Sequence, residues 1–324
     1  MICELDFNDN SMINMIEEFL KTNDADYMQN VKWNIIRNEH KKYYLYYILD
    51  NEILWTCNIL EKEKNNLKYL YAPRGPVMKK SDITLINHFL ENIKKWMIEH
   101  NYKKIVINPY LKFSDLSLIS SKYKYVVIDS HDYANLLESC KLAIVDIIFD
   151  EEKLIEKLPS KFRQNTRRSY RKGLINRISK NVNIDKFYDL YLQTSQRHDF
   201  KPHTKEYFKK LINTYKDSLI FLEVWYNDMP LAMSIDIVNN NKLIYLYGVS
   251  STENRNLLGM YNMQWEAIKY CIREEIPKYD LGGVFCDEND MNNKDYGLYN
   301  FKKGYCYNGF IDIVPDIVFD FGER

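Results

Sequence analysis

The strongest constraint on the fold of this chain is a pattern that occurs twice. In residues 43–75 and again in residues 219–252, an apolar run leads through a turn at an Asn into a second apolar run, then through an Asn-rich turn into a Tyr-Leu-Tyr segment. The turns are at Asn51 and Asn227, and in both copies the Tyr-Leu-Tyr segment starts 18 positions after that Asn. Short runs rich in β-branched and aromatic residues, separated by Asn and Asp, are typical of antiparallel strands. Each copy therefore predicts three antiparallel strands.

Each copy continues in the same way. Apolar residues three and four apart predict helices over about 81–100 and about 257–274. A further strand follows each helix, ending at Asn108 in the first copy and reading Lys-Tyr-Asp-Leu-Gly-Gly-Val in the second. A β-β-β-α-β unit that is used twice, about 176 residues apart, indicates duplication of one mixed α/β domain. The alternative interpretation is chance similarity between strand-rich segments.

The length of the chain agrees with two domains. Its 324 residues suit two cores of roughly 150 residues each. We predict a first domain of residues 1–146, to which the apolar segment 311–324 returns, and a second domain of residues 147–310. The repeated unit resembles the core of the Gcn5-related N-acetyltransferase (GNAT) fold. The predicted fold class is therefore mixed α/β (α+β), with two tandem GNAT-like domains.

The loop that would bind an acyl donor is degraded in both copies. The GNAT signature [RQ]-x-x-G-x-[GA] precedes a helix whose N-terminal amides face a pyrophosphate. In the second copy, Arg255 is one position out of register with Gly259, and Tyr261 occupies a place that needs a small residue. In the first copy, Pro76 follows Arg74 and Gly75 and removes an amide donor. The fold thus indicates acyl transfer, whereas the loop argues against acetyl-CoA, and we predict no cofactor.

One segment between the predicted domains is strongly basic. The 45 Lys and Arg residues balance 45 Asp and Glu residues, so a polyanion would have to bind a local patch. Residues 157–184 contain nine Lys or Arg residues and no acidic residue. We predict a basic helix over 157–180 that binds a phosphate backbone, and tRNA is the partner that suits a donor other than coenzyme A. The predicted contacts are Arg163, Arg167, Arg168, Arg171 and Lys172. The alternative is a solvated helix face that pairs with acidic residues elsewhere.

The remaining sequence patterns concern the cellular location of the protein and whether it binds a metal ion. The N-terminus has no basic region followed by an apolar run, and no stretch approaches the roughly 18–20 apolar residues of a membrane span. We therefore expect a cytoplasmic protein without a transmembrane segment, which would meet a membrane-linked substrate by transient contact at the membrane surface. The acidic residues 287–290 lack EF-hand spacing, so no metal site is predicted.

Several motifs resemble the FemAB family of peptidoglycan-bridge aminoacyltransferases. Residues 71–76 (YAPRGP) resemble its PRGP turn, 279–284 (YDLGGV) its YDfgGi strand, and 297–305 (GLYNFKKGY) its GLyxFKxgF motif. The last two motifs at this spacing are fairly specific, and the resemblance covers nearly the whole chain. No long helical hairpin interrupts residues 157–200, so the chain looks like the compact FemX type. The family moves an amino acid from aminoacyl-tRNA to an amine of a peptidoglycan precursor that is linked to a nucleotide or a lipid.

The resemblance implies roles for individual residues. Lys302 matches the position of a catalytic Lys, whose ammonium would stabilise the oxyanion that forms when an amine attacks an ester. On the residues alone, Lys302 would be a surface Lys on a β-hairpin. Asp280, at the end of a predicted strand, would orient the amine, and a turn-capping Asp is the alternative. Substrate-binding candidates are Arg37, Arg74, Arg197, His203, Tyr207, Tyr245 and Lys303.

The chain departs from the family pattern at three positions. Arg37 replaces a phosphate-binding Lys, and His203 replaces a phosphate-binding Arg. Asn108 stands where the family has a carboxylate, and an amide cannot accept a proton. The terminal ribose hydroxyl of the tRNA would then relay the proton. Two other functions stay open: a GNAT-fold N-acyltransferase that uses acyl-CoA on a saccharide or small molecule, and a catalytically inactive binding relative.

Overall fold

The fold consists of two units, each built around its own mixed sheet. In the computed structural model, residues 2–80, 82–132 and 135–322 are described. The first unit contains the residues up to Cys140 and those from Asp312 onward, and the second unit contains Lys141–Ile311. Among the helices of the described residues, none has the length and apolar character needed to cross a membrane.

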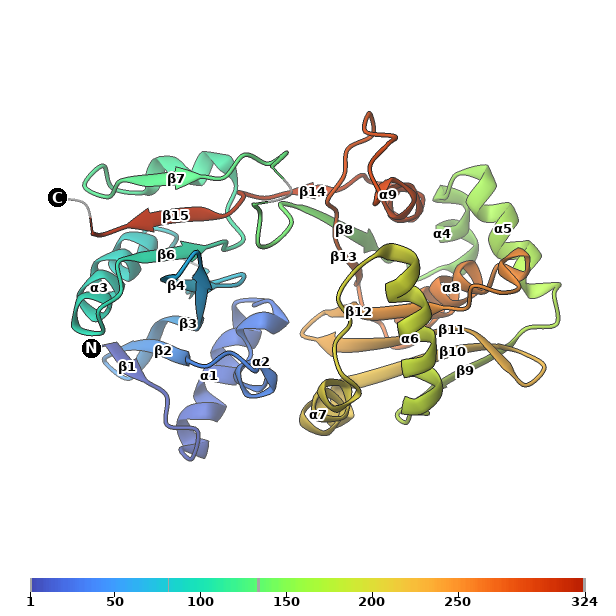
Figure 1. The fold of residues 1–324 in the computed structure, drawn as a ribbon, viewed down its shortest axis with the longest axis horizontal. Helices are drawn as coiled ribbons and strands as arrows, with labels where there is room; N and C mark the ends of the chain where they lie inside the picture. Colours follow the sequence, from blue (N-terminus) through green and yellow to red (C-terminus); the bar gives the residue numbers. More distant parts are fainter. Residues whose placement is uncertain (1, 81, 133–134, 323–324) are drawn as a thin grey trace. The chain divides into compact units, whose positions relative to one another are not determined.

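The first unit contains a sheet whose strands follow the order β1-β2-β3-β4-β6-β15-β7, with β5 paired to β3 (Figure 1). Strand β15 lies antiparallel between β6 and β7, so the end of the chain completes this sheet. The elements are β1 (Ile2–Glu4), α1 (Asn10–Thr22), η1 (Tyr27–Gln29), α2 (Val31–Ile36), β2 (Lys42–Leu49), β3 (Glu52–Lys64), β4 (Leu67–Ala72), β5 (Val77–Met78), α3 (Leu85–Glu99), β6 (Lys104–Ile107), η2 (Phe113–Leu118), β7 (Tyr125–Val127) and β15 (Ile317–Asp320).

The second unit contains a sheet of order β14-β8-β13-β12-β11-β10-β9. Residues 141–146, which the sequence had placed with the first domain, form β8 and pair with β13, so they belong to the second unit. The elements are β8 (Lys141–Asp146), α4 (Glu151–Lys157), α5 (Ser160–Tyr170), β9 (Ile175–Ser179), α6 (Ile184–His198), α7 (Lys205–Tyr215), η3 (Lys216–Ser218), β10 (Leu219–Tyr226), β11 (Met229–Asn239), β12 (Lys242–Ser250), η4 (Arg255–Leu257), α8 (Gly259–Arg273), β13 (Lys278–Gly283), α9 (Tyr296–Lys303) and β14 (Ile311–Asp312).

The predicted repeat is present in both units. Strands β2, β3 and β4, helix α3 and strand β6 correspond in order to β10, β11, β12, α8 and β13. Asn51 and Asn227 adopt positive φ angles of 63° and 52° in the first hairpin turns. Asn tolerates this left-handed conformation better than most residues, which explains the Asn at both turns. The mixed α/β fold class of two repeated units is therefore confirmed.

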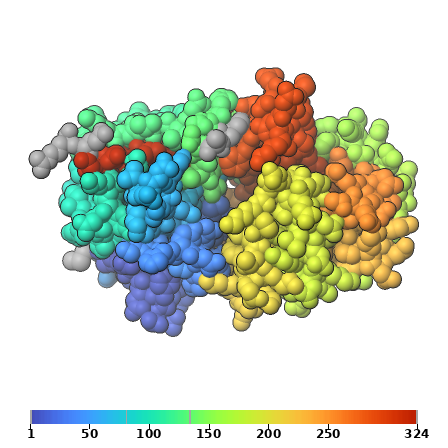
Figure 2. All heavy atoms as spheres, in the orientation of Figure 1, coloured from blue at the N-terminus to red at the C-terminus, as the bar shows by residue number. Residues whose placement is uncertain are grey.

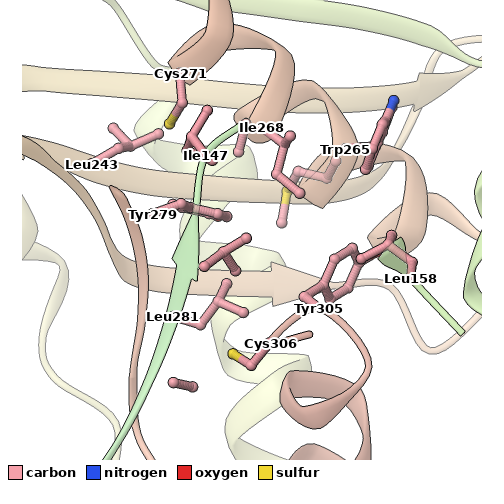
Figure 3. Close-up of a cluster of buried hydrophobic side chains, with 14 of the residues drawn as sticks. Ile147, Leu158, Leu243, Trp265, Ile268, Cys271, Tyr279, Leu281, Tyr305 and Cys306 are labelled. Carbon is pink, nitrogen blue, oxygen red and sulfur yellow. The ribbon is translucent and has the colours of Figure 1, made fainter. Parts of the chain in front are cut away.

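Helices cover the second sheet. Helix α8 packs on β10 to β13, and its Trp265, Ile268 and Cys271 belong to the same buried cluster as Leu243 and Tyr279 of the strands (Figure 3). Helix α6 contacts β11 and β12, and residues of α6 and α7 cover the face of this unit that Figure 2 shows. Burial along β10 is nearly continuous, as expected for a strand with apolar neighbours on both faces.

The basic segment is not one helix, which corrects the prediction of a helix over 157–180. Helix α5 ends at Tyr170, and the chain then turns into strand β9. Gly173, just beyond this helix, has φ +71°, a conformation that Gly adopts at little cost and that ends helices. No long hairpin arm is present between residues 157 and 200, where α5 and α6 are separated by β9.

Candidate functional site

Lys302 and Asp280 come together in the interior of the second unit. Lys302 lies near the end of α9 with 8% of its surface exposed, and its Nζ donates a hydrogen bond to the Gly283 carbonyl at 2.7 Å. Asp280, on β13, is 6% exposed and accepts a hydrogen bond from the Gly282 amide at 2.7 Å. Burial lowers the pKa of Lys302 to about 8, although Asp280 acts in the opposite direction. A buried cation with a displaced pKa is typical of functional sites.

The local structure of α9 explains why Lys302 is buried, whereas the residues alone had suggested a surface β-hairpin. Tyr296 and Tyr299, three positions apart, stack with their ring centroids 6.1 Å apart on one side of the helix. Tyr305 and Cys306, just after the helix, point into the apolar core (Figure 3). These anchors fix the end of α9 and with it the Lys302 ammonium.

Lys303, next to Lys302, has a different environment. Its Nζ forms an ion pair with Glu288 at 2.9 Å on the surface, and it lies 5.5 Å from the Tyr299 ring centroid. The side chain is half exposed, so the ion pair is screened by solvent. The structure therefore does not group Lys303 with Lys302 and Asp280.

Arg197 lines a surface cavity of about 460 Å³ in the second unit. The cavity is formed by the first residues of α8, the loop after β12, the N-terminal part of α5, the end of α6, and α9. Arg197 donates hydrogen bonds to the Ser250 carbonyl at 3.2 Å and to Ser250 Oγ at 2.9 Å. Arg255, Lys161 and Lys294, which were not among the predicted contacts, also line it. Arg255 was visible in the sequence only as part of the degraded donor loop.

His203 and Tyr207 form an aromatic cluster with Tyr247, a residue that sequence reasoning had not selected. The His203 and Tyr207 rings stack with centroids 4.2 Å apart, and the Tyr207 and Tyr247 hydroxyls are 2.9 Å apart. Tyr245 does not join them, because the register between β11 and β12 skips Leu246. Such a β-bulge reverses the side-chain alternation, so Tyr245 packs against the core that includes α8.

Helix α5 carries the basic residues on its exposed side. Its Thr166 and Ser169 are buried, and Ser169 accepts a hydrogen bond from Asn262 of α8 at 3.1 Å. Arg163 donates to the Glu156 carbonyl at 2.9 Å. The basic patch, defined as Arg167, Arg168, Arg171 and Lys172, forms no ion pair with a described residue.

Arg37, in the first unit, follows α2 and is paired with an acidic neighbour. Arg37 Nε donates to Glu39 Oε2 at 3.0 Å, and Lys62 pairs with the same carboxylate at 2.8 Å. The Arg37 guanidinium lies over the Trp33 ring at 4.9 Å. Although burial opposes it, the two cations lower the pKa of Glu39 to about 2. Arg37 is thus held in a charge network rather than extended into solvent.

Arg74, also in the first unit, is 5% exposed. Its Nη2 donates to the Ser139 carbonyl at 3.0 Å and lies 3.7 Å from Glu138, and its guanidinium lies over the Tyr110 ring at 5.6 Å. Burial lowers the pKa of Arg74, but Tyr110, Glu138 and Asp26 outweigh it and raise that pKa. Arg74 borders a cavity of about 250 Å³, whose other lining residues include 23–26, 76–80 and 109–111.

Metal ligands are not grouped in the described residues. There, no cluster of three or more His, Cys, Asp or Glu side chains is placed to hold a metal ion. Three features of the second unit are available for chemistry: the buried Lys302, the cationic cavity that Arg197 lines, and the aromatic cluster.

Comparison with known proteins identifies the family. The FemAB family model matches residues 14–130, 123–224 and 223–314. The aminoacyltransferase FemB of Staphylococcus epidermidis is 22% identical over 335 residues, which cover 79% of this chain and 80% of FemB. The UDP-N-acetylmuramoylpentapeptide-lysine N(6)-alanyltransferase of Weissella viridescens is 22% identical over 330 residues, covering 96% of both chains.

Solved structures agree on the fold. A crystal structure of FemX superposes with a TM-score of 0.83 at 17% identity and covers 99% of this chain and 97% of FemX. A tandem GNAT protein from the clavulanic acid biosynthesis pathway gives a TM-score of 0.55 at 7% identity, covering 100% of this chain and 99% of that protein. The tandem GNAT-like architecture is thereby confirmed. Since the family model matches most of the chain, the chain belongs to the FemAB family, and it is an enzyme of the acyltransferase class.

Proposed function

We propose that this protein is a cytoplasmic aminoacyltransferase that moves an amino acid from aminoacyl-tRNA to an amine of a peptidoglycan precursor. The observation that carries the proposal is the buried Lys302 beside Asp280 in the second unit. A cation held in a low-dielectric site stabilises developing negative charge far better than one in water. The Weissella viridescens relative, named as a lysine alanyltransferase, supports the amine acceptor.

The reaction needs few protein groups. The neutral acceptor amine attacks the ester carbonyl that joins the amino acid to the tRNA ribose, and a C–N bond forms. Lys302 stabilises the oxyanion of the tetrahedral intermediate. The C–O bond to the ribose then breaks, and the proton lost by the amine passes through the neighbouring ribose hydroxyl to the leaving ribose oxygen. Asn108 does not take this proton, because a carboxamide is not basic, and its amide donates a hydrogen bond to Asp316 at 2.7 Å.

Helix α5 supports a tRNA donor. Lys161 and Phe162, in its first turn, line the cavity, whereas the basic patch lies at its other end. The helix has 11 residues, so these two ends are about 15 Å apart at 1.5 Å per residue. A strand whose last nucleotide occupies the cavity would place phosphates further along the strand near the patch, where they would displace counterions.

The aromatic cluster supports the acceptor. His203, Tyr207 and Tyr247 offer ring faces and hydroxyl groups together, a combination that suits the apolar faces and polar groups of a saccharide-peptide precursor. Arg37, despite its pairing with Glu39, remains our candidate for the precursor phosphates, because a partly desolvated guanidinium binds phosphate well. A precursor linked to a lipid would be met at the membrane surface.

The test is a transfer assay with purified protein, charged tRNA and nucleotide- or lipid-linked precursor, read by mass spectrometry. Lys302→Met is expected to lower kcat by about 10²–10³-fold with little change in KM, since the lost contact forms mainly in the transition state. Lys269→Met, which removes a surface cation of α8 paired with Glu266, serves as the matched control and should stay near wild type.

Two outcomes would contradict the proposal. Full activity of the Lys302→Met variant would remove the oxyanion role. Transfer from an acyl-CoA, with none from any charged tRNA, would favour the second candidate function, a GNAT-type N-acyltransferase. The cationic cavity at the start of α8 is the observation that favours this second candidate. Precursor binding without turnover by the wild-type protein would indicate an inactive binding relative.

A further inference from the structure

The turn that follows Lys302 fixes the position of its ammonium. The Lys302 carbonyl accepts hydrogen bonds from the amides of Tyr305 at 3.0 Å and Cys306 at 3.1 Å, which form the turn that ends α9. The side chains of Tyr305 and Cys306 lie in the apolar core (Figure 3). The Lys302 Nζ donates to the Gly283 carbonyl of β13 at 2.7 Å. A shift of the turn would therefore move the ammonium relative to β13.

Gly304 lies within this turn, and it lacks a side chain for a reason of space. Its φ of −69° and ψ of −19° belong to the right-handed helical region, which any residue adopts. A Cβ placed on Gly304 would lie under 3.0 Å from three ring atoms of Phe162, namely Cζ, Cε1 and Cε2. The glycine therefore makes room for an aromatic ring and is not required by the backbone conformation.

The ring of Phe162 reaches the turn from α5. It packs edge to face against Tyr305, with an interplanar angle of 87° and 5.3 Å between the ring centroids. Phe301 precedes Lys302 in the sequence, and its ring centroid is 6.3 Å from that of Phe162. One side chain of α5 thus packs against the residue before Lys302 and against two residues that follow it. Protein interiors are close-packed, so a displaced ring would displace the turn.

Helix α5 is itself anchored on α8. Ser169 accepts a hydrogen bond from Asn262 at 3.1 Å, and the Tyr170 hydroxyl donates to Glu266. These contacts lie at the C-terminal end of α5, next to the basic patch, whereas Phe162 lies in its first turn. Packed side chains and rigid helices of this kind couple distant groups. The helix that carries the basic patch therefore also carries the ring that packs on the turn after α9.

We propose that Phe162 is a positioning residue for Lys302 and acts through Gly304. The ring fills the space beside Gly304, so it holds the turn that ends α9 and with it the ammonium. In this role Phe162 makes no contact with the reacting atoms. The inference rests on the proposed function, which assigns the oxyanion to Lys302. It links the helix that would contact tRNA to the group that would stabilise the transition state.

A pair of compensating substitutions tests the contact. Gly304→Ala adds a methyl group where the ring lies, so kcat should fall about 10²-fold with little change in KM, as for a misplacement of roughly 1 Å. Phe162→Leu removes the ring, and the loss of support for the turn should lower kcat about tenfold. In the Phe162→Leu/Gly304→Ala protein the methyl group has room. Its kcat should therefore recover to about the level of Phe162→Leu alone.

The pKa of Lys302 gives a readout that does not depend on turnover. An NMR titration of protein labelled with ¹³C at the lysine Cε atoms would follow it, and the signal missing from Lys302→Met identifies the residue. In wild type, burial should hold this pKa at about 8. Gly304→Ala and Phe162→Leu should each raise the pKa toward 10.5, because a displaced turn admits water to the ammonium. The double variant should return it toward the wild-type value.

Phe89→Leu is the matched control. Phe89 is fully buried in the core of the first unit, where its ring centroid is 5.1 Å from that of Trp55. The same loss of ring atoms there should lower the melting temperature and leave both kcat and the pKa of Lys302 unchanged. If Gly304→Ala does not fold, Phe162→Leu carries the test, since it only removes atoms from a partly buried side chain.

The outcomes separate this inference from the proposed function. Wild-type kcat and an unchanged Lys302 pKa in Phe162→Leu would overturn the positioning role, even if transfer from tRNA requires Lys302. A double variant no faster than Gly304→Ala would overturn it too, as would a rise in KM for charged tRNA as the sole effect of Phe162→Leu. A shifted Lys302 pKa in an enzyme whose Lys302→Met variant transfers at the wild-type rate would support the positioning and contradict the proposed role of Lys302.

Discussion

The two units share one order of elements but differ in how their parallel strands pair. In the first unit, the last three residues of β4, residues 70–72, pair with residues 105–107 of β6. In the second unit, only the first three residues of β12, residues 242–244, pair with residues 278–280 of β13. Residues 245–250 therefore extend beyond the pairing with β13. Both copies keep the order of elements, and Ser250, at the end of β12 that does not pair with β13, lines the cavity of the second unit.

The buried cations of the two units differ in how completely neighbouring groups compensate their charge. Arg74 in the first unit has partners on several sides, including Ser139, Glu138 and Tyr110. Lys302 in the second unit donates to one carbonyl and keeps a lowered pKa, which indicates incomplete compensation of its charge. A satisfied charge stabilises a fold, whereas an under-compensated charge is available to a substrate. We therefore expect stability effects in the first unit and activity effects in the second.

The largest expected effect is on stability, from Arg74→Met. Removing the guanidinium leaves the Glu138 and Asp26 carboxylates without their central cation, which should cost about 3–5 kcal/mol of unfolding free energy. Denaturant unfolding followed by circular dichroism would measure the change. Arg255→Met in the second unit is the matched control, and it should stay within about 0.5 kcal/mol of wild type because Arg255 is exposed and unpaired among the described residues. Equal losses in both variants would contradict the contrast between the two units.

The next largest effect is a dependence of kcat on pH. Lys302 acts as an ammonium, so kcat should fall about tenfold for each pH unit above its pKa of about 8. Steady-state rates from pH 6 to pH 10 would show this alkaline limb. In Lys302→Arg the cation does not titrate in this range, so the limb attributed to Lys302 should disappear whatever the absolute rate. An identical alkaline limb in that variant would assign the titration to another group.

The same pKa predicts a dependence of stability on pH. The folded-state pKa of Lys302 is depressed from 10.5, so between about pH 8 and pH 10.5 the unfolded state binds more protons and the unfolding free energy rises with pH. The rise attributable to Lys302 should be roughly 3 kcal/mol. Lys302→Met should lack this contribution when the two proteins are compared at each pH. Parallel stability profiles would show that burial does not depress the pKa of Lys302.

The smallest expected effects separate the two tyrosines of β12. Tyr247→Phe removes a hydroxyl 2.9 Å from that of Tyr207, so it should raise KM for the precursor by a fewfold, equivalent to about 1 kcal/mol. Tyr245→Phe should leave KM unchanged, because Tyr245 faces the core and burial raises the pKa of its hydroxyl far above the usual range. Steady-state kinetics with varied precursor would decide, and a larger KM change in Tyr245→Phe would contradict the placement of the bulge.

Much of the fold could be predicted because its signals are local. The Asn turns, the apolar periodicity of α3 and α8 and the Gly-Gly after Asp280 all lie within short windows of sequence. The site was harder, since the decisive features depend on neighbours distant in sequence. The bulge at Leu246 is a feature of the register between β11 and β12, which the sequence alone does not give. Because of this bulge, Tyr247 and not the predicted Tyr245 joins the aromatic cluster. The short α5 could have been anticipated from Gly173, a residue that commonly ends helices.

By itself, the sequence determined that this chain is a duplicated mixed α/β protein with FemAB motifs, because hydrophobic period and turn chemistry are properties of neighbouring residues. Only the tertiary structure decided that Lys302 is buried beside Asp280, that Arg74 is satisfied, and that Arg197 and Arg255 line one cavity. The physical reason is that burial and charge compensation depend on which distant segments pack together. Those two quantities separate a cation that supports the fold from one that can act on a substrate.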